Sequence, residues 1–321
     1  MTISSIYEPI QEDMARVEDS LRAISMADFP WMSEPLKHIV ESGGKRIRPA
    51  LTLLAGRFYR YDPELLVPMA TAIELFHAAT LVHDDTVDKS SVRRGRPTVN
   101  SLWGEGIAVL LGDYLFANSA QLVCDTGHLG VMRVFAQTLM NISSGQLRQF
   151  VSAFDWRQDR QEYYRQIESK TASLFSAASE SGALLSEAPA EAVEALKTYG
   201  HELGMAFQIV DDVLDFVGEE EEMGKPVGSD LLQGTLTLPV ILLMEQRPDD
   251  PVVREVFQKD GNEAGAQRVI EMIRNSSIVQ ECYRIASDFC DQARRALEEL
   301  PDNACRKSLL DLADYVIERR R

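Results

Sequence analysis

Two groups of aspartates have the spacing DDxxD, which can bind metal ions. The first aspartate cluster is Asp84, Asp85 and Asp88, and the second aspartate cluster is Asp211, Asp212 and Asp215. On a helix, the outer two aspartates of such a cluster lie one turn apart on one face, and the middle one lies to the side. Carboxylates this close repel one another unless a cation compensates their charge. The spacing therefore indicates a site for hard divalent cations.

Composition alone accounts for one pattern of this kind. The chain has 50 acidic residues among 321, so roughly one chance match to three acidic residues at this spacing is expected. Glu298, Glu299 and Asp302 form a third match that contains a proline, and we interpret it as the chance match. The two aspartate clusters instead follow the largely apolar segments 75–82 and 205–210. Half-buried carboxylates are costly; Mg²⁺ would compensate them and bridge them to phosphate groups, and structural salt bridges are the alternative.

Two basic segments could bind phosphate groups. GGKRIR spans residues 43–48, and RRGR spans residues 93–96, soon after the first aspartate cluster. Arginine presents paired donors that match phosphate oxygens, and glycine lets backbone N–H groups approach them. Either segment alone is typical of a solvated loop. Together with the aspartate clusters, they predict two phosphorylated ligands, one bound through metal ions and one bound directly by cations.

The sequence contains no recognisable covalent catalyst. It lacks GxSxG, a reactive cysteine motif and a phosphate-binding loop of the form GxxxxGKS/T. Metal ions on a diphosphate group bind it and stabilise it as a leaving group. Loss of diphosphate from an allylic carbon leaves a delocalised carbocation, which needs an apolar pocket and a positioned alkene. An enzyme for that reaction would carry metal-binding carboxylates, basic residues and an apolar cavity. This sequence contains the carboxylates and the basic residues.

Long helices must position these residues. No proline lies between Pro97 and Pro189, and that span has apolar residues at helical spacing. Period-two alternation is rare. Signals for breaks and loops occur at residues 41–49, 60–64, 90–98, 186–191, 218–230 and 245–251. We predict a single all-α domain over residues 1–321, a bundle of about ten or more helices.

The overall charge limits the possible partners. A formal charge of −17 opposes binding to nucleic acid and to anionic membrane surfaces. The N-terminal residues do not resemble a signal peptide, and no apolar run approaches about 18 residues, so we expect a cytoplasmic protein without a transmembrane segment. The four cysteines lack CxxC spacing, which favours buried free thiols. We interpret the basic end YVIERRR as a solvated terminus.

Five sequence blocks resemble one known family. GGKRIRP, LVHDDTVDKSSVRRGRPT, the KTA of residues 170–172, FQIVDDVLDF and GKPVGSDLLQGTLTLP occur in the order and approximate spacing of the trans-isoprenyl diphosphate synthases. The resemblance extends from about residue 35 to the C-terminus and is strongest to the long-chain polyprenyl diphosphate synthases. It implies an all-α isoprenoid synthase fold, in which the two aspartate clusters face each other across a central cavity and hold several Mg²⁺ ions.

The resemblance also implies roles for individual residues. All six aspartates would bind the metal ions that carry the allylic diphosphate, and Lys170 and Gln208 would join them as catalytic residues. The remaining allylic diphosphate contacts would be Arg93, Lys170 and Lys225. The residues holding isopentenyl diphosphate would be Lys45, Arg48, His77 and Arg94. Those lining the site near the reacting carbons would be Thr171 and Gln208. In the family, the departing diphosphate takes the proton lost after condensation.

Residues four and five positions before Asp84 could set the product length. These are Thr80 and Ala79, about one helical turn toward the N-terminus. Aromatic residues there block the channel in relatives that make farnesyl or geranylgeranyl diphosphate, whereas small residues leave it open. We therefore expect a long-chain product, hexaprenyl or longer. Phe76 or residues 135–140 could form the channel floor.

Two positions depart from the pattern of many relatives. Thr235 stands where they carry a second lysine, and Gln146 stands where they carry an acidic residue. Thr235 cannot supply the positive charge that a lysine would bring to the diphosphate. Gln146 does not alter the expected chemistry.

Other assignments remain open. A farnesyl or geranylgeranyl diphosphate synthase would share every block, whereas a terpene cyclase would not need the second cluster or GGKRIRP. A metal phosphohydrolase would use His83 beside Asp84, and a non-catalytic subunit of a heteromeric synthase usually loses its aspartates. From the family we expect a homodimer that takes isopentenyl diphosphate and an allylic diphosphate, and that passes its product to a membrane.

Overall fold

The structure, a computed structural model, describes residues 2–26, 30–218, 227–248, 250–258 and 263–319. Within these ranges the regular elements are helices and one short hairpin, which confirms the predicted all-α class. The elements of the first half are α1 (Ile3–Ile6), the 3₁₀ turn η1 (Glu8–Ile10), α2 (Gln11–Ile24), α3 (Pro30–Val40), α4 (Ile47–Gly56), α5 (Pro63–Val87), β1 (Val92–Arg93), β2 (Arg96–Pro97), α6 (Val99–Trp103), α7 (Glu105–Asp125) and α8 (Leu129–Ser152). The remaining elements are α9 (Arg160–Ile167), the π-helical turn η2 (Glu168–Ala172), α10 (Ser173–Leu185), α11 (Ala190–Val217), α13 (Ser229–Leu232), α14 (Leu238–Gln246), α15 (Val252–Gln258), α16 (Glu263–Arg274), α17 (Ile278–Ala296) and α18 (Ala304–Glu318).

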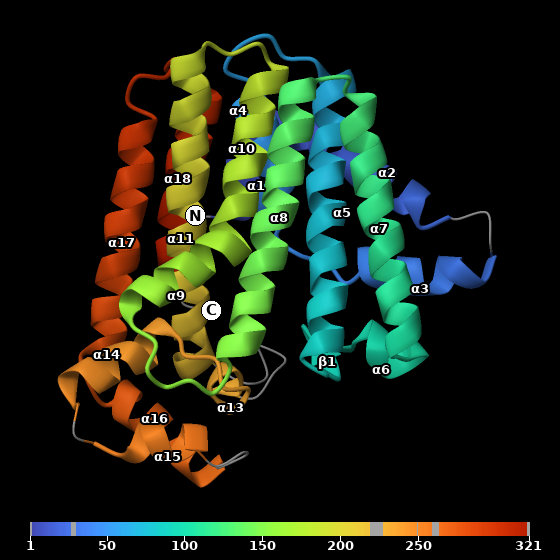
Figure 1. The fold of residues 1–321 in the computed structure, drawn as a ribbon. Coiled ribbons are helices and arrows are strands. Elements are labelled where there is room, and N and C mark those ends of the chain that lie inside the picture. Colours follow the sequence, from blue (N-terminus) through green and yellow to red (C-terminus); the bar gives the residue numbers. More distant parts are fainter. Residues whose placement is uncertain (1, 27–29, 219–226, 249, 259–262, 320–321) are drawn as a thin grey trace.

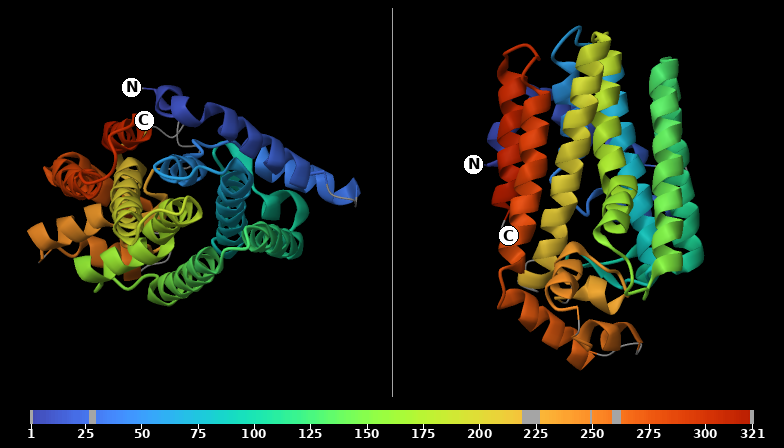
Figure 2. Two further views of the ribbon diagram at one scale, coloured as in Figure 1. Left: turned by 90° about the horizontal axis from the view of Figure 1, so that it is seen from above. Right: turned by 60° about the vertical axis from the view of Figure 1, so that its left-hand side comes forward.

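The long helices run side by side (Figure 1). Seen from above (Figure 2), α10 lies inside the bundle and contacts α4, α8 and α11. Helix α7 packs beside α5, and α17 packs beside α11, while α14, α15 and α16 lie together at one end of the bundle. This arrangement places η2, which continues directly into α10, in contact with both α8 and α11.

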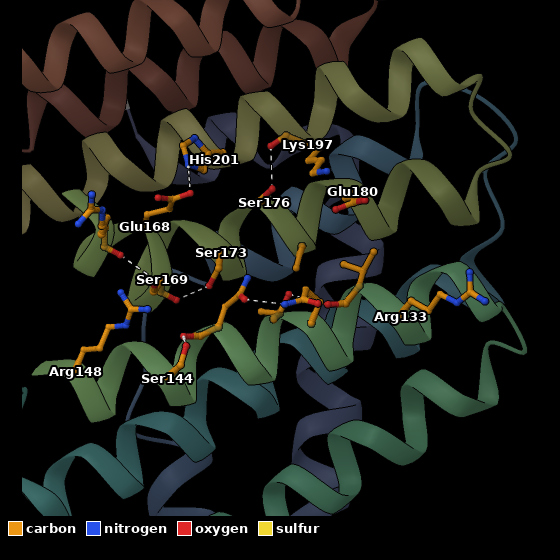
Figure 3. Close-up of a pocket in the computed structure, with 16 residues that line it drawn as sticks. Arg133, Ser144, Arg148, Glu168, Ser169, Ser173, Ser176, Glu180, Lys197 and His201 are labelled. Atoms are coloured by element: carbon orange, nitrogen blue, oxygen red, sulfur yellow. Dashed lines mark hydrogen bonds and ion pairs between the residues drawn. The ribbon is translucent and has the colours of Figure 1, made fainter. Parts of the chain in front are cut away.

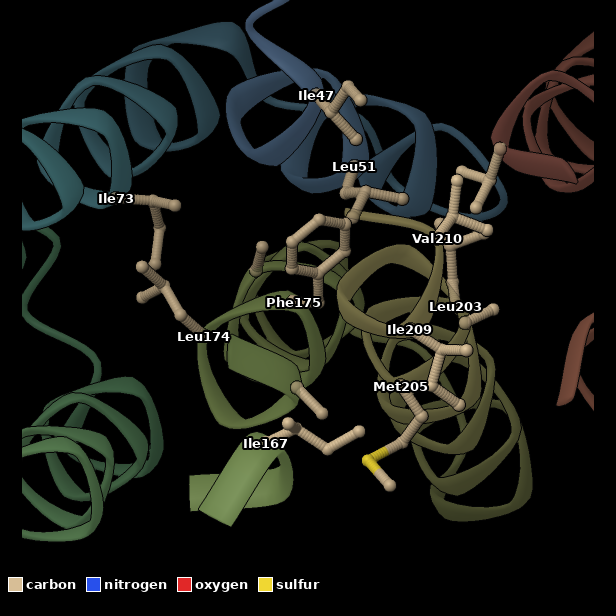
Figure 4. Packing of buried hydrophobic residues seen from close by; sticks show 14 of the residues in the cluster. Ile47, Leu51, Ile73, Ile167, Leu174, Phe175, Leu203, Met205, Ile209 and Val210 are labelled. Carbon is tan, nitrogen blue, oxygen red and sulfur yellow. The ribbon is translucent and has the colours of Figure 1, made fainter. Parts of the chain in front are cut away.

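Buried apolar residues form one cluster that includes both Ile6 and Val316. Figure 4 shows Phe175 of α10 near Ile47 and Leu51 of α4, with residues of α11 on its other side. Burial of side chains this large is the main stabilising term of such a bundle. Helices α5 and α11, which carry the two aspartate clusters, are therefore fixed by one shared core.

Two glycines let the central helices approach closely. A Cβ atom at Gly182 of α10 would lie 2.2 Å from the carbonyl oxygen of Thr52 in α4. A Cβ atom at Gly204 of α11 would lie 2.6 Å from Cα of Ala172 in η2. Backbone atoms in packed helices cannot easily move aside, so these two contacts require glycine.

The break predicted at residues 90–98 contains a short antiparallel hairpin. Val92 pairs with Pro97, and Arg93 pairs with Arg96. Arg94 and Gly95, between the strands, have φ values of 51° and 72°, as a type I′ turn requires. The hairpin fixes the directions of two arginines directly after the first aspartate cluster.

Helices α5 and α7 are long and apolar enough to cross a membrane by length and composition alone. In α5, 67% of the most apolar window is buried inside the molecule, against 33% in α7. Helix α5 is therefore a core helix of the bundle. Helix α7 leaves apolar side chains on its outer face, including Val109 and Leu110.

The cysteines agree with the prediction at three of four positions. Cys282, Cys290 and Cys305 are buried free thiols. Cys124 is exposed near the end of α7, so the prediction was wrong there. The reason is that Cys124 lies on the outer side of its helix, next to the buried Val123.

We expect Gly182→Ala to lower the free energy of unfolding by about 1–3 kcal/mol, because its new methyl group would overlap a backbone carbonyl of α4. Gly106→Ala is the matched control, since a Cβ atom there meets nothing within 4 Å and alanine favours the helix. Urea unfolding followed by circular dichroism measures both. Equal stability of the two variants would contradict the close approach of α10 and α4.

Candidate active site

The first aspartate cluster lies at the end of α5. Asp85 is 6% exposed, and Nε of Arg93 donates to its two carboxylate oxygens at 2.8 and 3.0 Å. Burial raises the pKa of Asp85, although Arg93 opposes that effect. Oδ2 of Asp84 lies 3.6 Å from Nζ of Lys170, and Asp88 is exposed at the C-cap of the helix. The protein therefore engages Asp85, whereas Asp84 and Asp88 are more accessible.

The second aspartate cluster lies near the end of α11 and is similarly divided. Asp212 is 4% exposed and accepts hydrogen bonds of 2.7 Å from Oη of Tyr163 and from Nε2 of Gln208. Burial raises the pKa of Asp212 to about 8. Asp215 is 1% exposed, whereas the side chain of Asp211 is 52% exposed. Each cluster thus has at least one buried aspartate that the protein holds and at least one aspartate that is more exposed.

The π-helical turn η2 connects the two clusters. Lys170 of this turn lies beside Asp84, and the next residue, Thr171, donates to Oε1 of Gln208 at 2.6 Å. Gln208 is the residue that donates to Asp212. π-Helical turns are rare and are frequent at functional sites. Two consecutive residues of one turn therefore contact both clusters, Lys170 directly and Thr171 through one amide.

Three basic residues and a histidine form what we call the cationic cluster: Lys45, Arg48, His77 and Arg94. Burial, followed by nearby arginines, lowers the pKa of Lys45 to about 8. Burial likewise lowers the pKa of Arg48 to about 10 and that of His77 well below its usual value, so His77 is neutral. Nε of Arg48 is buried without a hydrogen-bond partner in the described part of the chain. Cations that repel one another around an unpaired donor suit a multivalent anion.

Arg46 belongs to the same basic segment but does not join the cationic cluster. Its φ of 50° turns its side chain toward Glu18 and Glu74, whose carboxylate oxygens lie 2.7 and 2.6 Å from its guanidinium. Arg94 donates to the carbonyl oxygen of Gly43. These contacts fix the loop before α4 and join it to the hairpin.

The C-terminal arginine Arg319 is not solvated, so the predicted solvated terminus was wrong at this residue. Its side chain is 9% exposed, and Nη2 lies 3.1 Å from Oδ1 of Asp211. Its guanidinium lies 4.3 Å from the ring centroid of Phe207, a favourable cation–π contact. Its Nε and Nη1 are buried without partners among the described residues. A carboxylate and an aromatic face together replace solvent around the Arg319 side chain.

Of the two predicted chain-length positions, Ala79 is buried and Thr80 is partly exposed. Ala79 is fully buried, and Thr80 donates to the carbonyl oxygen of His77 at 2.8 Å. One turn earlier in α5, the ring of Phe76 makes edge contacts with Phe116 and Phe135 at centroid distances of 5.1 and 5.2 Å. The two predicted floor positions, Phe76 and Phe135, therefore touch each other.

Some residues near the site fall outside the prediction or the described structure. Lys225 lies outside the described residues. Gln149, which the sequence did not single out, donates to Oγ1 of Thr235 at 3.3 Å and accepts from Lys170 at 3.0 Å. Gln146 is half-buried, and its Oε1 has no partner among the described residues. The only sequence signal near Gln149 is Gln146, three positions before it on the same helix.

His83 and the third acidic match lie away from these contacts. Nε2 of His83 lies 3.1 Å from the carbonyl oxygen of Val109 and 3.6 Å from Asp113, both in α7. Glu298, Glu299 and Asp302 are exposed near the turn between α17 and α18. The structure therefore gives no support to a histidine–aspartate metal pair at residues 83–84.

A separate polar groove of about 700 Å³ lies between α8, α10 and α11 (Figure 3). Its side chains largely bind one another: Ser173 donates to the carbonyl oxygen of Ser169 at 2.7 Å, and His201 lies 3.7 Å from Glu168. Among the described residues, none of the predicted site residues lines it. The groove is therefore distinct from the aspartate and cationic clusters.

Comparison with known proteins agrees with this arrangement. The family model for polyprenyl synthetase matches residues 29–273. The chain is 39% identical over 320 residues to heptaprenyl diphosphate synthase component 2 of Geobacillus stearothermophilus, covering 99% of each chain. A crystal structure of a decaprenyl diphosphate synthase from Rhodobacter capsulatus matches with a TM-score of 0.92 at 40% identity, covering 100% of both chains. A polyprenyl synthase from Caulobacter crescentus, solved with calcium and isoprenyl diphosphate, matches with a TM-score of 0.95 at 33% identity, covering 100% of this chain and 98% of that one.

An all-α bundle with two aspartate clusters beside a cluster of basic side chains, together with matches of this extent, defines a prenyltransferase. The chain belongs to the polyprenyl synthetase family. The resemblance found in the five sequence blocks is thereby confirmed.

We expect the affinity for inorganic diphosphate to fall as the pH rises from about 7 to about 9, because Lys45, whose pKa is about 8, loses its positive charge in that range. Lys45→Arg should remove this loss, since arginine stays charged. Isothermal titration calorimetry at several pH values measures the affinity of the wild type and of Lys45→Arg for diphosphate. The ratio of these two affinities is free of the protonation of diphosphate itself, because that affects both proteins equally. A ratio that stays constant with pH would contradict the role of Lys45.

Proposed function

We propose that the chain is an all-trans polyprenyl diphosphate synthase, which condenses isopentenyl diphosphate head-to-tail with an allylic diphosphate. The observation that carries this proposal is the proximity of an acidic and a cationic site. The turn η2 contacts the first aspartate cluster through Lys170 and reaches the second through Thr171 and Gln208. The cationic cluster is near enough to Asp211 and Arg319 for both to affect the pKa of Lys45. Relatives named heptaprenyl and decaprenyl diphosphate synthase support the same reaction.

We propose Mg²⁺ as the metal, with several ions bound together with the allylic diphosphate. Asp84, Asp88 and Asp211 are the accessible carboxylates, and carboxylate oxygens are ligands that Mg²⁺ prefers. The other three aspartates are buried and already accept hydrogen bonds from the protein, so we propose that they orient the site. Among the described residues, no three acidic, imidazole or thiol groups converge enough to hold an ion unaided. Mg²⁺ commonly completes its shell with water and substrate phosphate, and when bound it would stabilise the departing diphosphate.

The basic residues would then divide between the two substrates. We propose that Arg93 and Lys170, with Lys225, bind the allylic diphosphate, because Arg93 and Lys170 are already paired with the first aspartate cluster. Lys45, Arg48 and Arg94 would bind isopentenyl diphosphate directly, and neutral His77 would donate one hydrogen bond to it. The allylic diphosphate would thus be bound mainly through metal ions, and isopentenyl diphosphate would be bound directly by basic side chains.

The reaction itself would need little proton transfer by the protein. We propose that the allylic carbon–oxygen bond breaks, that the alkene of isopentenyl diphosphate attacks the resulting cation, and that the departing diphosphate takes the released proton. Thr171 and Gln208 lie near this point, and their mutual hydrogen bond of 2.6 Å fixes the direction of both polar groups. The apolar residues around Phe175 would exclude water that could capture the cation.

We propose a long-chain product, hexaprenyl or longer, because the side chains of Ala79 and Thr80, one turn from the first aspartate cluster, are small. The contacting rings of Phe76, Phe116 and Phe135 are the proposed floor of the channel. A shorter product, farnesyl or geranylgeranyl diphosphate, is the alternative if these rings stop the growing chain early. A terpene cyclase is less well supported, since it would have no use for the cationic cluster.

We also propose that the protein is a single-domain homodimer. Apolar side chains are exposed on the outer faces of two adjacent helices, which a second copy would cover: Leu110 on α7, and Met140, Leu147, Phe150 and Val151 on α8. A heteromeric assembly is the alternative, because two relatives are named as a component 2. We further propose a cytoplasmic enzyme that does not bind nucleic acid and that passes its product to a membrane.

The purified chain with Mg²⁺, farnesyl diphosphate and labelled isopentenyl diphosphate should form labelled polyprenyl diphosphates. Asp84→Ala and Asp211→Ala should each lower kcat by about 100-fold or more, because each removes a stabiliser of the leaving group. Asp302→Ala, in the exposed third match, is the control and should retain activity. Wild-type inactivity, or full activity of both aspartate variants, would refute the proposed site. Activity of the chain alone would also exclude a non-catalytic subunit.

Ala79→Phe should shorten the product, because the ring would fill the channel next to the metal site. Phe135→Ala should lengthen it by removing part of the proposed floor. Ala190→Phe, at the exposed start of α11, is the control and should leave the product distribution unchanged. Reversed-phase chromatography of the dephosphorylated products measures chain length. An unaltered distribution in both test variants would show that the product is limited elsewhere.

A further inference from the structure

A continuous series of contacts joins the two aspartate clusters, and Gln149 lies in the middle of it. On one side, Lys170 lies 3.6 Å from Asp84 of the first cluster and donates to Oε1 of Gln149 at 3.0 Å. On the other side, Nε2 of Gln149 donates to Oγ1 of Thr235 at 3.3 Å. Helix α8 thus binds both η2 and the segment before α14 through a single amide.

The series continues from Thr235 to the second cluster. The backbone N–H of Thr235 donates to the carbonyl oxygen of Asp230 at 2.9 Å. The backbone N–H of Asp230 and the hydroxyl of Ser229 donate to the carboxylate of Asp215 at 3.3 and 3.0 Å. The position of Thr235 is therefore fixed by the same short segment that holds Asp215.

Only an amide suits both contacts of residue 149. Its carbonyl oxygen can accept from the ammonium group of Lys170 while its NH₂ group donates to Thr235. A carboxylate would accept from Lys170 but would add a negative charge next to Asp84. An apolar side chain of similar size would leave both neighbours without this partner. The amide adds no charge of its own, so beyond its ion pair with Asp84 the ammonium group of Lys170 is not neutralised further and can still attract an anion.

We infer that Gln149 is a positioning residue that directs the charge of Lys170 to the allylic diphosphate and keeps Thr235 in place. This inference rests on the proposed function, because it assigns that substrate to Lys170. Residue 235 is a threonine, and its hydroxyl brings no charge to the site. Of the two groups that Gln149 contacts, Lys170 therefore supplies the only positive charge, and a neutral neighbour preserves it.

The decisive variant is Gln149→Glu, which keeps the size of the side chain and adds one charge. We expect the KM for the allylic diphosphate, and the dissociation constant of inorganic diphosphate in the presence of Mg²⁺, to rise by about tenfold or more. The KM for isopentenyl diphosphate should stay within about twofold, because the cationic cluster is untouched. Gln149→Glu combined with Thr235→Lys should recover most of the affinity, because the new lysine supplies a positive partner.

The matched control is Gln137→Glu, the same change on the same helix, where the side chain is exposed and donates to Oδ1 of Asn141 at 2.9 Å. It should behave as the wild type. Equal affinity of Gln149→Glu and wild type for diphosphate would overturn the inference, as would a parallel loss for both substrates. Diphosphate binding by calorimetry tests Gln149 even if the wild type shows no turnover, an outcome that would refute the proposed function instead.

Discussion

Repulsion between carboxylates that are close together and partly desolvated is the constraint on which this structure depends. Each cluster places three aspartates within five residues of one helix, and burial alone disfavours their charged forms. Hydrogen-bond donors of the protein stabilise the buried carboxylates. The guanidinium of Arg93 donates to Asp85, and the phenol of Tyr163 and the amide of Gln208 donate to Asp212. Asp84, Asp88 and Asp211 are more exposed than these two, and they are the ones that we propose bind an external cation.

The helical bundle fixes the positions of the two aspartate clusters. Helices α5 and α11 belong to one apolar core, and the close contacts at Gly182 and Gly204 fix α10 and η2 against their neighbours. Lys170 and Thr171, which follow one another in η2, can therefore reach opposite clusters without any change in the helices. The basic segment before α4 is held as firmly, because Arg46 is paired with two carboxylates.

The parts of the site that the sequence revealed are those in which the partners lie close in the chain. The helical spacing of the aspartates and the arginines beside them could be predicted, and Asp85 and Arg93 are only 8 residues apart. The missed contacts join distant residues: Tyr163 and Asp212 are 49 residues apart, and Arg319 and Asp211 are 108 apart. A single sequence does not relate side chains over such separations. Arg46 was grouped with the phosphate-binding residues, because a left-handed backbone turn at this position is not visible in the pattern GGKRIR.

The π-helical turn η2 also determines how α9 is rotated about its axis relative to α10. From Arg160 to Leu185 the chain runs through α9, η2 and α10 without a break, so any residue removed from η2 would turn α9 by about 100° relative to α10. Tyr163 would then point away from Asp212, while the bundle around α10 could remain packed. A π-helical turn contains one residue more than an α-helical turn. This additional residue therefore sets the directions in which Tyr163, Lys170 and Thr171 point from one continuous helical segment.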